Sequence, residues 1–426
     1  MTKNVALALL ALTPLLLGVV NGEPATPPDP LPLSWLLEQA EAENSSIAME
    51  RAAAEAAAHR ITPAGALEDP RLSYQAINLP IDDFDFDSTP MSGNQFWLSQ
   101  KFPFPGVLSN RQKAARADSS AATSALKDRR NRIRSAVERA FAELGFAQRG
   151  LEITDRNIDL LRQLTRVAEA KYRVGTGLQQ DVLRAQVELT ALLQERLHRI
   201  ESIAEAEAVM NSLLNRMANS RFPRTSELRE EASTPDLAGL LERLETTSAL
   251  MQASRARIEE AERRERATQF AGYPDFDLGI GYRIRQRAPG DPIAGDDFLS
   301  AGVTVRLPVN RAKWRERVAE RAALVRHAKA AHRDLRARLG EKIGTTFADL
   351  ERAGAEVALL ETGLVPQARQ SLESSRSGYA VNKVDFLSLV DSQMRVLDSE
   401  LRLVRAVADR RAAFAALEAA VGEKLR

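Results

Sequence analysis

Two patterns of hydrophobic and polar positions alternate along the chain. Most of it repeats apolar residues at three- and four-residue spacing, which predicts amphipathic helices. Residues 274–285, with the sequence PDFDLGIGYRIR, instead alternate apolar and polar residues one by one. That period is typical of a strand with one apolar face. We therefore expect long helices interrupted by short strands.

Three further stretches have the character of strands. Residues 69–80 and 95–106 flank an acidic, turn-rich loop. Residues 298–308 follow the strand at 274–285 after a loop of Gly, Pro and Asp. Extended segments separated by turn residues predict β-hairpins. We expect one hairpin at about 70–106 and another at about 274–308.

The helical pattern predicts two long helical hairpins. The first covers about 109–218 with a break at 174–177, and the second covers about 310–420 with a break at 381–383. A segment of over sixty residues would be about 90 to 100 Å long. Pro366 has no counterpart in the first hairpin, so we expect a kink in one hairpin only.

A shorter helix is expected before each β-hairpin. The first covers residues 33–60, with Ser34 as N-cap and with Pro63 and Gly65 ending it, and the second covers about 237–268. The order of helix, β-hairpin and helical hairpin thus occurs twice, and residues 172–189 align with residues 379–396 without a gap. The chain is predicted to be a tandem duplication. The expected divisions are a signal peptide (1–22), a first repeat (23–220), a linker (221–236), a second repeat (237–420) and a tail (421–426).

The N-terminus has the pattern of a secretory signal. Lys3 precedes an apolar run from Val5 to Val20, small residues lie near Gly22, and a Pro-rich segment follows. We expect residues 1–22 to direct export. The chain contains no cysteine, so we expect neither disulfides nor a lipid anchor on an N-terminal cysteine.

Composition and motifs exclude several classes of function. The formal net charge is +1, which argues against nucleic acid as a partner. His327 and His332 are five residues apart on one expected helix, a poor spacing for a metal pair, so we expect surface roles for them and no metal site. No Ser-His-Asp arrangement, phosphate-binding Gly loop or HExxH motif is present. We expect no enzyme activity and no cofactor.

The strand at 274–285 has the length and alternation of a strand that crosses a bilayer. Four strands in one chain cannot close a water-filled barrel, and an open strand edge cannot exist in lipid. We therefore expect a barrel shared between copies, in which the neighbours of this strand include strands from other subunits. Asp277, Arg283 and Arg285 are expected to line its lumen. The residues expected to face lipid are Phe276, Leu278, Ile280, Tyr282 and Ile284.

With these features the chain resembles the TolC-like outer-membrane efflux protein (outer membrane factor) family, including its heavy-metal and multidrug branch associated with RND pumps. The resemblance is carried by the duplicated order, by KFPFPG (101–106), by YRVGTGLQQDVLRAQ (172–186) and by its echo YAVNKVDFLSLVDSQ (379–393). It implies a mainly α fold with a small β part, built as a homotrimer. A twelve-stranded β-barrel would lie in the outer membrane of a Gram-negative cell, and an α-helical tunnel would lie in the periplasm. It also implies a periplasmic adaptor and an inner-membrane transporter of RND type as partners.

The resemblance further implies a gate at the helical turns. The tip that would close the tunnel and contact the adaptor consists of Val174, Gly175, Thr176, Gly177, Val381, Asn382 and Lys383. Asn382 stands where the motif usually has Gly, and Asn tolerates a left-handed conformation. An acidic ring at the entrance falls on Asp391, with Asp385 one turn earlier in place of Ser388, which is not acidic. Capping or solvated roles for both acids stay open, because acidic residues are common near helix starts.

The leading interpretation is therefore an outer-membrane exit duct of a tripartite efflux system. The alternative is a soluble periplasmic coiled-coil adaptor or scaffold, which would also be exported and rich in helix. A third hypothesis, an enzyme of the cell envelope, has no arrangement of catalytic residues to support it. The cargo stays open among metal ions, drugs, solvents and polypeptides.

Overall fold

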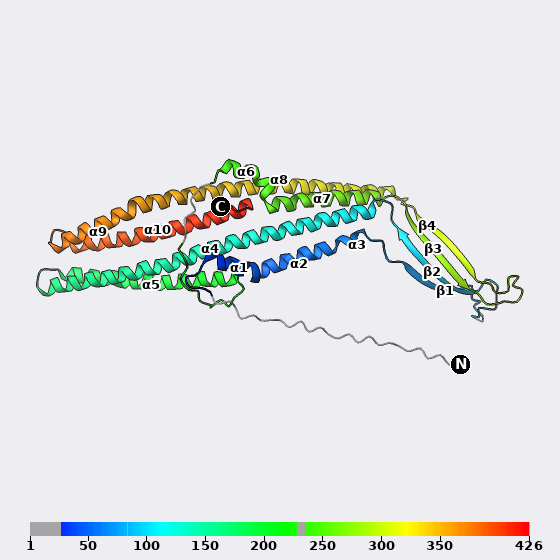
Figure 1. The fold of residues 1–426 in the computed structure, drawn as a ribbon, viewed down its shortest axis with the longest axis horizontal. Coiled ribbons are helices and arrows are strands. Elements are labelled where there is room, and N and C mark those ends of the chain that lie inside the picture. Colours follow the sequence, from blue (N-terminus) through cyan, green and yellow to red (C-terminus); the bar gives the residue numbers. More distant parts are fainter. Residues whose placement is uncertain (1–26, 83, 228–234, 426) are drawn as a thin grey trace, which may run out of the picture.

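The chain folds into an elongated rod with a small sheet at one end (Figure 1). The computed structural model describes residues 27–82, 84–227 and 235–425. Long helices run along the rod, their turns lie at the end opposite the sheet, and the C-terminus lies part of the way along it. The mainly α fold with a small β part is confirmed. The expected signal peptide falls outside the described residues.

The first repeat contains one very long helical hairpin. Helix α4 (Val107–Arg173) has 67 residues, which corresponds to about 100 Å at 1.5 Å per residue. Helix α5 (Gln179–Leu213) returns along it. Before the β-hairpin lie α1 (Leu33–Glu43), α2 (Ser45–His59) and α3 (Ile61–Gly65).

The prediction of a single helix over residues 33–60 was wrong. The helix breaks at Asn44, whose side chain accepts hydrogen bonds from the Ser46 and Ile47 amides and starts α2. Ser34 lies inside α1, which has no side-chain cap. Pro63 lies within α3, where its missing N–H costs little because the first turn of a helix has no acceptor for it.

The second repeat has the same order with more interruptions. Ser248 accepts a hydrogen bond from the Met251 amide and divides the expected helix at 237–268 into α6 (Leu237–Thr247) and α7 (Ala249–Phe270). The long hairpin is built from α8 (Arg311–Leu359), the π-helical turn η1 (Leu360–Leu364), α9 (Val365–Ala380) and α10 (Phe386–Val421). The π-helical turn ends two residues before Pro366, which cannot donate a helical hydrogen bond. The helix is thus irregular beside Pro366, while α4 continues unbroken past Asp159, and the kink itself stays a prediction.

Within the described residues, four strands form one antiparallel sheet in the order β1-β2-β3-β4. They are β1 (Arg71–Ile77), β2 (Gly93–Phe102), β3 (Asp275–Ile284) and β4 (Phe298–Arg306). Both expected hairpins are present, and β2 pairs with β3 to join them. The sheet thus combines strands from both repeats.

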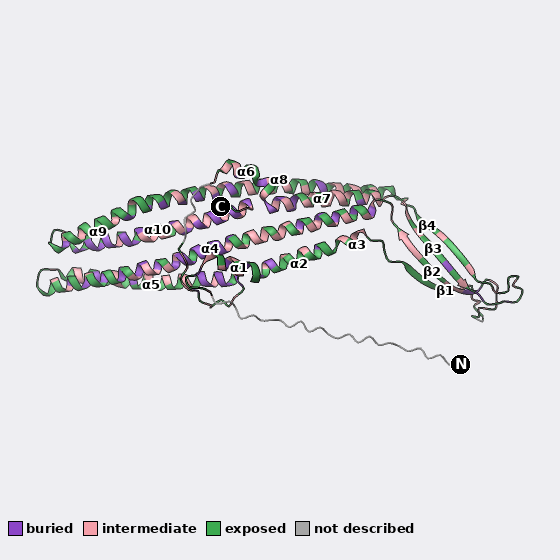
Figure 2. Ribbon diagram, in the orientation of Figure 1, coloured by how far each residue is buried: buried purple, intermediate pink, exposed green. Residues whose placement is uncertain are grey.

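Buried residues, purple in Figure 2, recur along the long helices, and the apolar ones among them form clusters between helices. Near the middle of the rod Leu36, Leu144 and Met210 belong to one buried cluster. Toward the turns Leu161 and Phe386 belong to another, which joins the two hairpins. Much of the sheet is green or pink in the same view. Of the helices that the structure describes, none is both long and apolar enough to cross a membrane.

Candidate functional site

One face of the sheet is apolar across the described strands. Leu98 of β2 lies opposite Ile280 of β3, which lies opposite Ala301 of β4. Residues paired across antiparallel strands point to the same side, so alternate positions form one continuous surface. Its large apolar members, exposed by 37–73%, are Leu72, Tyr74, Phe96, Leu98, Phe102, Phe276, Leu278, Ile280, Tyr282, Ile284, Leu299, Val303 and Val305. The row predicted to face lipid lies entirely on this surface.

The opposite face of the sheet is polar. Arg283 donates hydrogen bonds of 3.0 and 3.2 Å to the Gln95 side-chain oxygen. Asp277 is paired with Lys101 on β2 and with Thr304 on β4, so it lies on the same face. Two of the residues predicted to line a lumen, Asp277 and Arg283, therefore share this surface.

Arg285 does not belong to the polar face, and its prediction as a lumen residue was wrong. Its side chain is 1% exposed and forms an ion pair of 2.6 Å with Asp291 in the loop between β3 and β4. The guanidinium also lies 4.4 Å from the ring centre of Phe298. The alternation was extended one residue beyond Ile284, where the strand ends and the chain turns back on itself. Arg285 instead bonds to that loop, at the Asp291 carboxylate and the Asp296 carbonyl.

The expectation that β3 has neighbours from other subunits was also wrong. Both of its edges are paired within the chain, with β2 on one side and β4 on the other. Only β1 and β4 lie at the edges of this sheet, and no described strand pairs with their outer sides. The backbone groups on those outer sides need hydrogen-bond partners from water or another chain.

The two helical tips at the far end of the rod are built alike. In the first, the Thr176 amide donates to the Lys171 carbonyl at 2.9 Å, and in the second the Lys383 amide donates to the Gly378 carbonyl at 2.9 Å. This pattern closes a helix through a residue in the left-handed region. Gly175 has φ 74° and Asn382 has φ 60° at the matching positions. The left-handed conformation predicted for Asn382 is confirmed.

Apolar side chains are exposed at both tips. Val174 is 73% exposed and Val381 is 62% exposed. Each directly follows the last residue of its helix, so neither packs into the seam behind it. The remaining predicted tip residues are Gly175, Thr176, Gly177, Asn382 and Lys383, all exposed except Gly177, which is half-buried.

Lys171 joins the two tips and was not recognised from the sequence. Its ammonium donates hydrogen bonds of 2.9 Å to the Tyr379 carbonyl and 2.7 Å to the Asn382 side-chain oxygen. It also lies 4.0 Å from the centre of the Tyr379 ring, a cation–π contact. Burial raises the pKa of the Tyr379 phenol, so the ring stays neutral beneath the cation. The repeat alignment could have drawn attention to Lys171. It places Lys171 opposite Gly378, so the second repeat has no equivalent cation.

The two acidic residues predicted for the entrance have local partners. Asp385 is the N-cap of α10 and accepts a hydrogen bond of 2.6 Å from the Ser388 amide, which lowers the pKa of its carboxyl. Asp391 lies one turn into the helix, is 60% exposed, and forms an ion pair of 3.1 Å with Arg395. Asp385 therefore has the capping role that stayed open, and Asp391 is a carboxylate available on the helix surface beside a partner.

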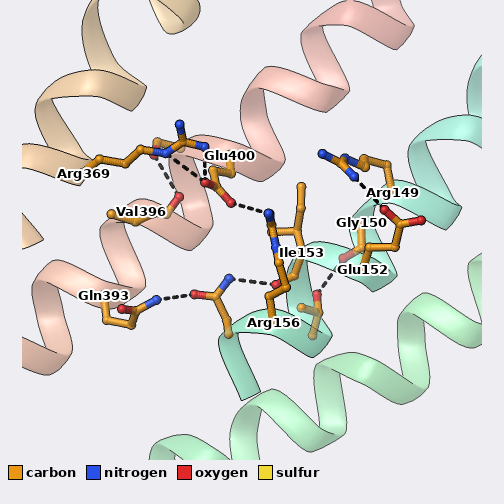
Figure 3. Close-up of polar contacts among 12 residues, drawn as sticks. Arg149, Gly150, Glu152, Ile153, Arg156, Arg369, Gln393, Val396 and Glu400 are labelled. Carbon is orange, nitrogen blue, oxygen red and sulfur yellow. Dashed lines mark hydrogen bonds and ion pairs between the residues drawn. The ribbon is translucent and has the colours of Figure 1, made fainter. Parts of the chain in front are cut away.

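Polar contacts connect α4 with α10 between the tip and the middle of the rod (Figure 3). Glu400 of α10 receives hydrogen bonds from Arg156 of α4 at 2.9 Å and from Arg369 of α9 at 2.6 Å. Nearby, the Gln393 amide donates to the side chain of Asn157 at 2.5 Å, in a buried position. The seam between the two repeats thus combines apolar packing with directional bonds, which favour one alignment of the hairpins.

The histidines do not form a metal site within the described chain. His332 lies 3.2 Å from the Ser254 hydroxyl and 3.8 Å from Glu245, and its side chain is only 18% exposed. The surface role predicted for it was therefore wrong, while His327 is exposed. No group of three or more His, Cys, Asp or Glu among the described residues is placed to hold a metal ion.

The sequence model of the family described as outer membrane efflux protein matches residues 36–216. The cobalt-zinc-cadmium resistance protein CzcC of Cupriavidus metallidurans is 21% identical over 300 residues, which are 70% of this chain and 69% of CzcC.

Solved structures extend the similarity to nearly the whole chain. The outer-membrane channel OprN superposes with a TM-score of 0.76 at 17% identity, covering 92% of this chain and 89% of OprN. The outer membrane protein VceC of Vibrio cholerae also gives 0.76, at 19% identity, covering 92% of this chain and 97% of VceC. CusC gives 0.76 at 14% identity, covering 92% of each chain. Residues 36–216 therefore match the outer membrane efflux protein family, and the chain has the fold of the outer-membrane proteins OprN, VceC and CusC.

Proposed function

We propose that three copies of this chain form the exit duct, with their sheets closing a twelve-stranded barrel in the outer membrane and their helices continuing the passage through the periplasm. The observation that carries this proposal is the exposed apolar face of the sheet, which extends across β1 to β4. Such a face is stable against lipid and costly against water. Pairing β4 of one copy with β1 of the next would satisfy both open edges, as lipid requires.

The polar face of the sheet would then line the lumen, and no chemistry is required of the chain. Solutes would pass by diffusion, and the inner-membrane pump, of RND type, would supply the energy. Export of the chain itself would be directed by residues 1–22, and the two repeats would each contribute one hairpin to the barrel and one to the tunnel. Sequencing the N-terminus of the mature protein tests whether residues 1–22 are removed as a signal peptide.

The helical tips would form the gate. Lys171 connects the end of the first helical hairpin to Tyr379 and Asn382 at the end of the second. Opening the tunnel by moving one hairpin away from the other would break this contact. Asp391, repeated three times around the axis, would place negative charge at the entrance.

The exposed tip valines would meet the periplasmic adaptor. Val174 and Val381 expose apolar surface to water at the end of the rod, and exposed apolar surface is typical of a protein–protein contact. A helical adaptor that covers them would gain the free energy of burying them and could displace the Lys171 contact in the same step.

Divalent metal ions are the cargo that the comparisons favour, since the relative CzcC is named for cobalt, zinc and cadmium resistance. Deleting the gene should lower the concentrations of Co²⁺, Zn²⁺ and Cd²⁺ that stop growth, and expression from a plasmid should restore them. Equal growth with and without the gene, together with greater sensitivity to organic toxicants, would assign the duct to another cargo.

Membrane fractionation followed by sizing in mild detergent tests the proposed assembly. We expect the protein in the outer-membrane fraction and a trimer in detergent. A monomer recovered from the periplasm without detergent would instead support the soluble adaptor alternative, because the apolar sheet face would then have to be covered in some other way.

A further inference from the structure

The indole of Trp97 lies flat against the polar face of the sheet. Trp97 is in the middle of β2, paired with Gly281 on β3. Its ring extends across β3 toward β4, where it contacts Gly302. The ring is half-buried against the sheet.

Three glycines make this position possible. A Cβ on Gly279 would lie 2.5 Å from Trp97 Cε2, one on Gly281 would lie 2.9 Å from Cζ3, and one on Gly302 would lie 3.0 Å from Cη2. All three distances are shorter than the 3.5–4.0 Å at which carbon atoms attract each other. Any residue other than glycine at Gly279 or Gly281 would therefore lift the ring from the sheet. We call Gly279, Gly281 and Gly302 the glycine platform.

Most of the glycines in the described strands lie beside Trp97. The described strands contain four glycines, and three of them form the platform. Glycine weakens a strand, so its presence inside one often marks the close approach of another group. Here the approaching group is the ring of Trp97, which covers the backbone that the glycines leave bare.

We propose that Trp97 and the glycine platform set the bore of the barrel. The inference rests on the proposed function, in which the polar face lines the lumen. Three copies would place three indoles at one level of the barrel, each flat against the wall. The largest side chain on the polar face would then occupy little of the passage, and solutes of larger cross-section could pass.

The consequence for selectivity follows from where the displaced ring would lie. A Cβ on the platform occupies the space of the indole, so the ring would rise from the sheet into the lumen of the proposed barrel. Three such rings at one level would form a constriction. Gly281→Ala should therefore exclude large solutes that the native barrel admits, while removal of the ring should cancel the effect.

The test uses thiol labelling from outside the cell, because the chain has no cysteine of its own. Thr304→Cys places a thiol on the polar face on the periplasmic side of Trp97, and Gln75→Cys places one on its outer side, since Gln75 pairs with Gln95. Both native side chains are exposed. Labelling with a small and a bulky membrane-impermeant maleimide does not depend on the distant tip gate.

We expect Gly281→Ala to slow the bulky reagent severalfold at the Thr304→Cys thiol and to leave the small reagent and the Gln75→Cys thiol unaffected. Adding Trp97→Ser to Gly281→Ala should restore the rate. Gly344→Ala, where a Cβ meets nothing within 4 Å, is the matched control and should change no rate. Heat-resistant trimer on a gel checks assembly, and Gly302→Ala, with the mildest contact, replaces Gly281→Ala if that variant does not assemble.

Two results would overturn the inference in different ways. An unchanged bulky-reagent rate in an assembled Gly281→Ala trimer would show that the platform only packs the ring and does not set the bore. A Thr304→Cys thiol that the small reagent does not reach, beside a Gln75→Cys thiol that it does, would overturn the exit duct itself and the bore proposal with it.

Discussion

The Lys171 ammonium donates a hydrogen bond of 2.7 Å to the side-chain oxygen of Asn382, joining two helical tips that are 211 residues apart in sequence. The same ammonium bonds the Tyr379 carbonyl and lies over the Tyr379 ring. A single cation therefore holds three groups of the opposite hairpin. Because each contact needs the hairpins side by side, Lys171 favours the arrangement in which the two tips lie together, which would be the closed one in the proposed gate.

Lys171→Met should favour the open tip. We expect more frequent or larger conductance steps in planar bilayers and greater sensitivity of cells to large antibiotics that the outer membrane normally excludes. Arg173→Met is the matched control, since Arg173 is an exposed cation on the same helix end with no ion partner among the described residues. A Lys171→Met channel that stays as closed as the native one would remove this residue from the gate.

Asp391 and Arg395 allow an acidic gate to be distinguished from an ordinary surface ion pair. If Asp391 contributes negative charge to the entrance, Asp391→Ala should weaken channel block by divalent cations. Arg395→Ala should strengthen the block, because it leaves the carboxylate without its counter-charge. A surface pair without a gating role predicts no change in block for either variant. The measurement is the concentration of divalent cation that halves conductance.

Asp385 should stabilise the start of α10 in a pH-dependent way. The carboxylate accepts the Ser388 amide, and this bond lowers its pKa below the ordinary value of 3.8. Its contribution is therefore present above 3.8 and is lost as pH falls through the lower pKa of the folded state. Asp385→Ala should speed hydrogen exchange of the Ser388 amide at neutral pH, and the difference from native should disappear in acid.

Asp385→Asn is the control for this capping role. Asparagine keeps an oxygen acceptor and is as favourable an N-cap as aspartate, so exchange at Ser388 should stay slow across the pH range. Equal exchange rates in the native protein and Asp385→Ala at neutral pH would show that the cap does not hold this turn.

The alternating strand at 274–285 could be predicted because the alternation of apolar and polar residues is visible in consecutive residues. Recognising it requires no knowledge of the rest of the fold. The turn at Asn382 was equally accessible, since the repeat alignment placed it opposite Gly175. The helix breaks at Asn44 and Ser248 were missed, although both residue types are favoured N-caps. Their flanking helices share one periodic pattern, and periodicity alone does not show where a helix restarts.

The contacts between the repeats could not be derived from local pattern. Lys171 meets Asn382 because two long hairpins align over their whole length, and a small change in that alignment would separate them. The burial of Arg285 likewise depends on how the loop returns to Asp291. The pairing of β2 with β3 was missed for the same reason, since it joins hairpins from different repeats.

The buried ion pair between Glu138 and Arg411 should stabilise the rod. Glu138 lies on α4 and Arg411 on α10, their atoms are 2.8 Å apart, and their side chains are 3% and 8% exposed. Arg411→Met removes the guanidinium that pairs with this buried carboxylate, and breaking a buried ion pair on one side costs about 3–5 kcal/mol. Thermal unfolding followed by circular dichroism should show a clear decrease in Tm. The double variant Glu138→Leu/Arg411→Met should recover most of it, and a double variant less stable than Arg411→Met would contradict the assignment.

Ile280 lies near the centre of the apolar sheet face, opposite Leu98 on one side and Ala301 on the other. If this face contacts lipid, an arginine there must be taken from water into the middle of the bilayer, at about 2–4 kcal/mol for each copy. Ile280→Arg should therefore reduce the yield of heat-resistant trimer in the outer membrane. Thr304→Arg, which places the same side chain on the polar face, should assemble as the native chain does. Normal trimer yield from Ile280→Arg would mean that the apolar face does not contact lipid, and equal losses from both variants would mean that the loss does not depend on which face carries the arginine.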